Sequence, residues 1–133
     1  MTYYLGIDTS AYTTSLALVD GTGQIFSDER LILQVEQGRR GLRQSEALFL
    51  HIKNLPELVE RIEPGVLPKI KGIAVSAFPR SVEGSYMPVF LAGAAAARTL
   101  AAALGVSLVK VSHQEGHIRA GMVGNPCLKP ANG

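Results

Sequence analysis

The alternation of apolar and polar positions predicts three short strands in the first quarter of the chain. "YYLGIDTS" is typical of a strand that enters a core and ends in small polar residues. "TTSLALVDGTG" alternates apolar and polar residues up to a glycine-rich turn after Asp20, and "QIFSDERLILQ" resumes the extended pattern. We therefore expect residues 3–34 to form an antiparallel meander, followed by a loop at "EQGRRG".

A helix is predicted next, because apolar residues recur at helical spacing from Gln44 onward. The stripe consists of Ala47, Leu48, Leu50, Ile52, Leu55, Leu58, Val59 and Ile62. Pro56 falls inside the stripe and is expected to kink the helix or to restart it from Asn54. His51 lies in the same pattern, and we interpret it as a surface residue.

The second half of the chain alternates strands and helices. "IKGIAVSAFP" is nearly all apolar, as in a strand covered on both faces, and "SLVKVS" predicts another strand. Between them, "PVFLAGAAAARTLAAALG" predicts an alanine-rich helix that ends at Gly105. "HQEGHIRAGM" begins a further short helix. The order β-β-β-α-β-α-β-α predicts an α/β fold, a mixed sheet with an antiparallel meander and helices on its faces.

Composition narrows the class of protein. The chain has 133 residues, 47% apolar and 18% charged, as expected of one globular domain. A net charge of +2 is too small to indicate nucleic-acid binding by itself. Arg98 interrupts the alanine-rich segment, which falls short of the about 20 continuous apolar residues that span a membrane. No secretory signal is recognisable, and Cys127 is the only cysteine, so we expect an inert thiol in a cytoplasmic protein.

The first candidate site is the turn after the first strand, at Asp8, Thr9 and Ser10. Hydroxyls and backbone N–H groups in a tight turn can hold a phosphate, and the Asp8 carboxylate can hold a hydrated Mg²⁺. The alternative is an ordinary hairpin, in which aspartate and serine satisfy nearby backbone groups.

The second candidate is a histidine pair, His113 and His117, directly after the last predicted strand. Residues four apart share one helix face, so both imidazoles can reach a single metal ion. A catalytic zinc site uses about three protein ligands, and Glu115 stands on roughly the opposite side of such a helix. The alternative is two polar residues that cap and solvate the start of a helix.

Further polar clusters and one apolar face allow both a functional and an ordinary interpretation. The polar residues are Arg39, Arg40 and Arg43 in one loop, and Arg80, Ser81 and Ser85 in another. Each loop either meets phosphates or is simply solvated. The alanine-rich helix is expected to be mainly core, with a face for a partner helix as the second interpretation.

Taken in order, these segments resemble the first half of the TsaD family, also called glycoproteases or O-sialoglycoprotein endopeptidases. "LGIDTSAYTTSLALVD" is similar to the opening hairpin of that family, and "SEALFLHIKNLPELVERI" to its first long helix. The segment from "IKGIAVSAFP" to "VSHQEGHIRAG" resembles the following strand, glycine loop, small-residue helix, strand and HxxxH motif. The resemblance implies a ribonuclease H-like lobe of the actin-like ATPase type over residues 1–121, with a tail over 122–133.

The resemblance also implies a function. His113 and His117 correspond to two metal ligands, for Zn or Fe, whose further ligand comes from a second lobe. Asp8, Thr9 and Ser10 fall at the start of a loop for a nucleotide, ATP with Mg²⁺ or an adenylate. The family transfers a threonylcarbamoyl group to tRNA, and its members form homodimers or heterodimers with a related protein through the helices of this lobe.

The chain also departs from the family pattern. "FPRSVEG" stands where the family has a "GPGL"-like loop, and "AYTTS" lacks the acidic residues typical of the bacterial transferase. The chain ends before a "SGGHT"-like loop and the second lobe, so we expect an N-terminal fragment or a shortened relative. Alternatives to an inactive lobe of the transferase are a non-catalytic paralogue that dimerises as a scaffold, and the protease of the older label.

Overall fold

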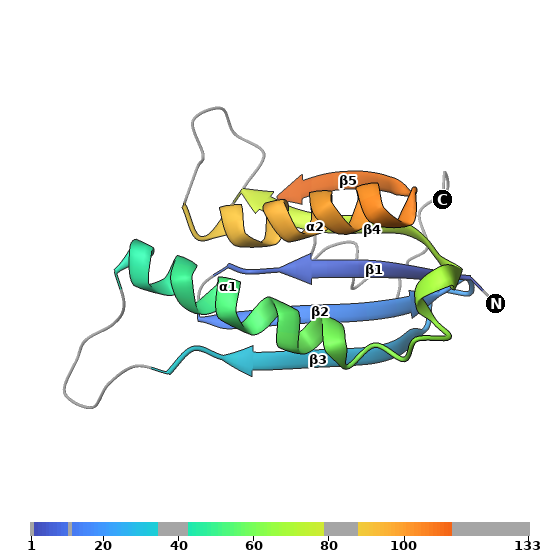
Figure 1. The fold of residues 1–133 in the computed structure, drawn as a ribbon, viewed down its shortest axis with the longest axis horizontal. Helices are drawn as coiled ribbons and strands as arrows, with labels where there is room; N and C mark the ends of the chain where they lie inside the picture. Colours follow the sequence, from blue (N-terminus) through green and yellow to red (C-terminus); the bar gives the residue numbers. More distant parts are fainter. Residues whose placement is uncertain (1, 11, 35–42, 79–87, 113–133) are drawn as a thin grey trace, which may run out of the picture.

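Five strands form one mixed sheet in the order β3-β2-β1-β4-β5 (Figure 1). The computed structural model describes residues 2–10, 12–34, 43–78 and 88–112. The strands are β1 (Tyr3–Asp8), β2 (Thr13–Asp20), β3 (Ile25–Ile32), β4 (Ile70–Phe78) and β5 (Ser107–Ser112). The helices are α1 (Gln44–Glu60), the short 3₁₀ helix η1 (Leu67–Lys69) and α2 (Phe90–Leu104).

The pairing of the strands confirms the predicted meander and the crossovers that follow it. β1 pairs antiparallel with β2, and β2 pairs antiparallel with β3. β4 runs parallel to both β1 and β5, so β1 joins the antiparallel half of the sheet to the parallel half. The helix expected over "HQEGHIRAGM" lies outside the described residues.

Both helices lie on the same face of the sheet (Figure 1). Their apolar stripes pack on the alternate strand residues that point toward them, in a core that includes Leu5, Leu16, Ile73, Leu58 and Ala97. Ala74, which alternates with Ile73 and Val75 in β4, is exposed on the other face. The expectation that β4 is covered on both faces is therefore wrong at Ala74.

α1 is one continuous helix from Gln44 to Glu60, so the predicted restart at Asn54 is wrong. Pro56 is exposed, while its neighbours Leu55 and Leu58 are buried against the sheet. Burial of that face offsets the backbone hydrogen bond that proline cannot donate. The end of α2 agrees with prediction, since Gly105 has a left-handed backbone at φ 68° and stops the helix.

His51 is fully buried, which corrects its interpretation as a surface residue. Its Nδ1 lies 2.7 Å from the hydroxyl of Thr14, at the start of β2. Asn54 donates from Nδ2 to the same hydroxyl oxygen at 3.2 Å. The helix pattern could not reveal this, because the partner that makes burial of the imidazole tolerable lies 37 positions away in the sequence.

Neither α1 nor α2, the two α-helices in the part of the chain described, is long and apolar enough to cross a membrane.

Candidate functional site

Three parallel strands end at the same edge of the sheet, where their arrowheads point in one direction (Figure 1). β1 ends at Asp8 and β5 ends at Ser112, and β4 separates them. The register aligns Ile7 with Val75, and Val75 with Lys110. Two strand spacings amount to about 10 Å, so the chain leaves β1 and β5 at nearby points. Ligands of open α/β sheets bind at such an edge.

The turn after β1 is built around Asp8. The backbone N–H of Ser10 donates to Asp8 Oδ1 at 2.7 Å, and the Asp8 side chain is half-buried. This bond is the local turn chemistry of the hairpin interpretation. It also holds a carboxylate, an oxygen ligand of the kind that Mg²⁺ binds, at the edge where β1 and β5 end.

Thr9 points into the protein and is fully buried. Its hydroxyl donates to the carbonyl oxygen of Val89 at 2.9 Å and accepts from the backbone N–H of Gly93 at 3.1 Å. Both bonds tie the end of β1 to the first turns of α2. Thr9 therefore positions the turn, and Ser10, which is 9% exposed, lies beside it.

Gly93 is a packing position beside the candidate site that the sequence pattern did not indicate. A Cβ at Gly93 would lie 2.9 Å from Thr9 Oγ1 and 3.4 Å from a methyl of Ile7. Contacts under 3.0 Å do not occur without movement, so only glycine lets α2 approach the end of β1 this closely. The signal in the sequence was a single glycine at the start of an alanine-rich helix.

The remaining candidate residues are not all described. His113 and His117 lie outside the described residues, as do Arg39, Arg40, Arg80, Ser81, Ser85 and Cys127. Within residues 2–10, 12–34, 43–78 and 88–112, no three His, Cys, Asp or Glu side chains gather to hold a metal ion. Arg43 is described and exposed, and its backbone N–H donates to Glu46 at the start of α1.

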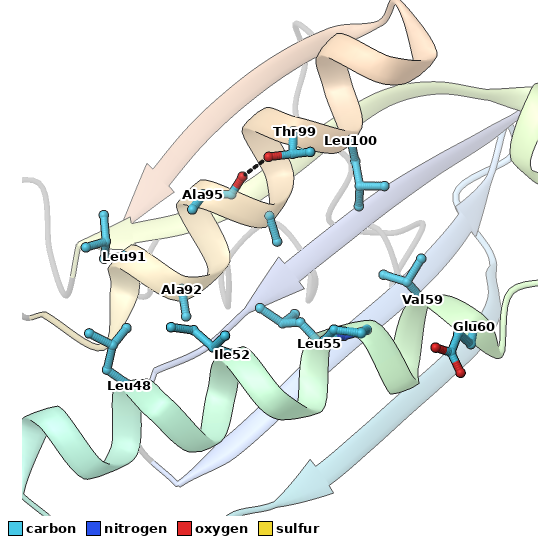
Figure 2. Close-up of a pocket in the computed structure, with 12 residues that line it drawn as sticks. Leu48, Ile52, Leu55, Val59, Glu60, Leu91, Ala92, Ala95, Thr99 and Leu100 are labelled. Atoms are coloured by element: carbon cyan, nitrogen blue, oxygen red, sulfur yellow. Dashed lines mark hydrogen bonds between the residues drawn. The ribbon is translucent and has the colours of Figure 1, made fainter.

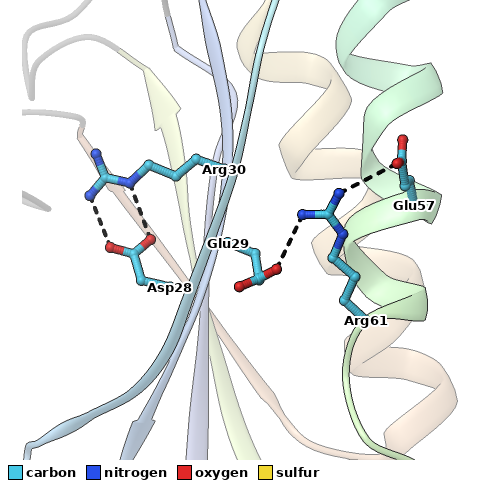
Figure 3. Close-up of polar contacts among 5 residues, drawn as sticks. All are labelled: Asp28, Glu29, Arg30, Glu57 and Arg61. Atoms are coloured by element: carbon cyan, nitrogen blue, oxygen red, sulfur yellow. Dashed lines mark hydrogen bonds and ion pairs between the residues drawn. The ribbon is translucent and has the colours of Figure 1, made fainter.

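Two side chains in the antiparallel half of the sheet, Asp20 and Arg30, have shifted pKa values. The hydroxyl of Thr22 donates to Asp20 at 2.6 Å and lowers the pKa of that carboxyl below its usual range. On β3, the hydrogen bonds from Arg30 to Asp28 raise the pKa of the guanidinium (Figure 3). β3 and α1 are also joined by Arg61, which bonds to Glu29 at 3.1 Å and to Glu57 at 3.4 Å.

An apolar groove of about 690 Å³ runs between α1 and α2 on the side away from the sheet (Figure 2). α1 contributes large side chains and α2 mainly small ones. The lining residues are Leu48, Ile52, Leu55, Pro56, Val59 and Glu60 of α1, and Leu91, Ala92, Ala95, Ala96, Thr99 and Leu100 of α2. α2 thus serves both the core, through Ala97 and Ala101, and an open surface.

Part of the chain matches a known protein-family model. Residues 33–131 match the TsaD model, which is described as tRNA N6-adenosine threonylcarbamoyltransferase.

Curated relatives match nearly the whole chain. A tRNA N6-adenosine threonylcarbamoyltransferase of Thermotoga neapolitana is 30% identical over 95% of this chain and 38% of its own length. A probable bifunctional tRNA threonylcarbamoyladenosine biosynthesis protein of Methanothermobacter thermautotrophicus is 31% identical over 96% of this chain and 23% of its own length. The chain thus spans well under half the length of these relatives.

Solved structures share the fold. YeaZ from Pseudomonas aeruginosa superposes with a TM-score of 0.58 at 24% identity, over 84% of this chain and 44% of that chain. RuvC of T. thermophilus in complex with a Holliday junction substrate superposes with a TM-score of 0.51 at 13% identity, over 86% of this chain and 67% of that chain. The expected ribonuclease H-like fold is confirmed.

Proposed function

Because the chain belongs to the TsaD family of tRNA N6-adenosine threonylcarbamoyltransferases, we propose that it supplies the nucleotide- and metal-binding lobe of a tRNA-modifying protein. The lobe comprises residues 1–121, and residues 122–133 are the tail that follows it. The product is threonylcarbamoyladenosine in tRNA, which the names of two relatives also mention. The lobe acts in the cytoplasm and is inactive without a second lobe.

One observation carries the proposal: β1 and β5 end at the same edge of the sheet. Asp8 closes β1, and His113 is the next residue after β5. The oxygen donors of Asp8 and Ser10 suit Mg²⁺ and a phosphate, and the imidazoles of His113 and His117 suit Zn or Fe. The bond from Ser10 to Asp8 and the bonds of Thr9 to α2 support a preformed turn.

Each residue has a separate role in this proposal. Asp8 and Ser10 bind the nucleotide end of the donor, and Thr9 holds their turn in place. His113 and His117 would hold a metal together with a ligand from a second lobe, and such a metal would supply Lewis-acid chemistry to the carbamoyl group of the donor.

Calorimetry on the full chain tests the two halves of this site separately. We expect Asp8→Asn to weaken Mg-ATP binding by roughly tenfold or more, because it removes a charged oxygen donor. Asp20→Asn, at the opposite end of the β1–β2 pair, is the matched control and should bind as wild type does. Equal binding by the Asp8→Asn variant would contradict the nucleotide assignment.

Metal binding is measured in the same way with Zn²⁺ and Fe²⁺. We expect His113→Ala and His117→Ala each to reduce the affinity by roughly tenfold or more, since each removes one ligand. Gln114→Ala is the control between them. Unchanged uptake of both metals by both histidine variants would remove the metal site from the proposal.

The groove favours a second function, that of a scaffold that pairs with another lobe. We propose that a second copy of this helix pair covers it, in a homodimer or in a heterodimer with a related family chain. The large side chains of α1, including Ile52 and Val59, are complementary in size to the small side chains Ala95 and Ala96 on α2. A two-fold axis places the large side chains of α1 in each copy against the small residues of α2 in the other. This function needs no occupied metal site.

A further inference from the structure

Gly6 lies in β1, the central strand of the sheet, and no close contact with the described residues requires a glycine there. A Cβ at Gly6 would meet only the backbone oxygen of Ala17, at the ordinary distance of 4.0 Å. At Gly93, by contrast, a Cβ would lie 2.9 Å from the Thr9 hydroxyl. Glycine weakens the interior of a strand and often marks a place where a ligand approaches the backbone closely.

Gly6 belongs to the face of the sheet away from α1 and α2, which we call the far face. Its neighbours Leu5 and Ile7 are buried in the core, and successive residues of a strand point to opposite faces. The register aligns Gly6 with Ala17 of β2 and with Ala74 of β4. Three of the smallest residues therefore form one row across the middle of the far face.

A second row, of polar side chains, lies beside the first, toward the end of β1. Asp8 pairs with Ser15 of β2. In β4, Ser76 follows Val75, the partner of Ile7, and so takes the position beside Asp8. Each of these three polar residues alternates with a core residue along its own strand, so all three lie on the far face.

The Ser76 side chain is available to a ligand at this position. Ser76 is only 5% exposed, and its hydroxyl makes no hydrogen bond within the part of the chain that the structure describes. No unpaired side-chain oxygen of these residues is sealed from solvent, so the Ser76 hydroxyl opens to the surface. The row therefore offers a hydrogen-bonding group directly beside a carboxylate.

Asp8 supplies the carboxylate of this row. On the far side of Ser15, the same row continues with Arg30 of β3, two strand spacings or about 10 Å from Asp8. Arg30 donates two hydrogen bonds to Asp28, so its charge is paired (Figure 3). A carboxylate is a preferred ligand of Mg²⁺, which keeps several of its water molecules when it binds to proteins. Hydroxyls beside the carboxylate can bond to those water molecules.

We propose that a hydrated divalent cation lies on the far face above Gly6, with Asp8 as its charged ligand and the hydroxyls of Ser15 and Ser76 bonded to its water molecules. The identification of the ion as Mg²⁺ carrying a nucleotide phosphate rests on the proposed nucleotide function of the turn after β1. A Mg–O distance of about 2.1 Å and a hydrogen bond of about 2.8 Å place such a hydroxyl about 4 to 5 Å from the ion. Adjacent strands are about 4.8 Å apart, so hydroxyls on both neighbours of β1 are within reach.

Mn²⁺ is the probe for this site, because it accepts the same oxygen ligands as Mg²⁺ and broadens the NMR signals of nearby groups. The methyl groups of Ala17 and Ala74 lie on the far face, whereas those of Leu16 and Val75 lie in the core on the same two strands. The full chain is titrated with Mn-ATP and, separately, with Mn²⁺ alone. We expect the alanine methyls to broaden roughly tenfold or more above the core methyls, since the effect falls steeply with distance and the sheet separates the two sets.

Three variants test the residues of the site. Gly6→Val should fold, because a Cβ there meets no close atom, and should abolish the broadening, because its side chain occupies the place of the ion. Ser76→Ala should weaken Mn²⁺ binding roughly threefold to tenfold, as expected for a lost hydrogen bond. Ser107→Ala is the matched control, an exposed serine at the start of β5 on the same face, and should bind as wild type does. If the valine variant does not fold, Ser15→Ala replaces it and should weaken binding as Ser76→Ala does.

Equal broadening of the alanine and core methyls, or equal losses in Ser76→Ala and Ser107→Ala, would overturn the site on the far face. Mn-ATP that binds without broadening Ala17 and Ala74 would also overturn it and leave the nucleotide function intact. If ATP does not bind, but Mn²⁺ alone broadens these methyls in wild type and not in Gly6→Val, the cation site is supported and the nucleotide function is overturned. No broadening with either probe would overturn the cation site.

Discussion

Gly93 sets the distance between α2 and the end of β1. Gly93→Ala places a methyl group 2.9 Å from the Thr9 hydroxyl, so either the helix or the strand end must move. We expect the free energy of unfolding to fall by roughly 1 to 3 kcal/mol, as in other overpacked cores. Chemical denaturation of the full chain measures this loss.

Gly65→Ala is the matched control, because a Cβ at Gly65 meets no atom within 4 Å. That substitution should leave stability unchanged or raise it slightly, since alanine has less freedom in the unfolded chain. Equal effects at both glycines would show that the close approach at Thr9 does not matter.

At the residue scale, sequence reasoning located side chains but not their partners. Asp8, Thr9 and Ser10 were predicted as one turn, and they form one. Their separate roles were not predictable, because the bonds of Thr9 to Val89 and Gly93 span 80 and 84 positions. The same reason explains the error at His51 of α1, which is buried against the hydroxyl of Thr14 on β2, 37 positions away.

At the scale of elements, α1 contains a proline that local rules place at a helix boundary. Pro56 has no N–H to donate, and its ring crowds the carbonyl of Ile52 one turn earlier. We expect Pro56→Ala to raise the free energy of unfolding by about 1 to 3 kcal/mol, measured by chemical denaturation. Ser45→Ala, another exposed position in α1, should gain at most about 0.5 kcal/mol. A gain at Pro56 no larger than that at Ser45 would mean that the helix accommodates the ring without strain.

The elements themselves were largely predictable because their apolar periodicity is strong. All five strands and both helices described were expected, and β5 has the predicted bounds of Ser107–Ser112. The restart at Asn54 was wrong because the rule for proline considers only the helix. In the folded chain, Leu55 and Leu58 pack against the sheet and keep the helix continuous.

At the scale of the whole molecule, the groove predicts association. Ile52 lines it and is 52% exposed, whereas Phe49 is 61% exposed on α1 but does not line it. We expect Ile52→Asp to weaken self-association by roughly tenfold or more, because a carboxylate would be buried in an apolar interface. Sedimentation velocity over a range of concentrations measures the equilibrium.

Phe49→Asp is the control and should associate as wild type does. A wild-type chain that stays monomeric at high concentration would contradict the homodimer. In that case, binding to a related family lobe, lost in Ile52→Asp alone, would support the heterodimer.

The apolar periodicity could not predict which face of the sheet each helix covers. Alternation shows that a strand has a covered face, but not which elements cover it. Both α1 and α2 lie on one face of the sheet, and this places their outer sides next to each other as a groove (Figure 2). The metal site predicted at His113 and His117 also depends on which side chains lie close together in space. Both histidines lie outside the described residues, so that site stays a prediction.

The central place of β1 in the sheet also has a consequence during synthesis. β2 follows β1 directly in the sequence, but the second neighbour of β1 is β4. That strand begins at Ile70, which pairs with Tyr3 and lies 67 positions further along the chain (70 minus 3). At roughly 5 to 20 residues per second, a ribosome needs about 3 to 13 s to make that stretch. Throughout that interval the nascent chain carries a hydrogen-bonding strand edge without its native cover, so a chaperone that shields such edges would bind the meander before β4 emerges.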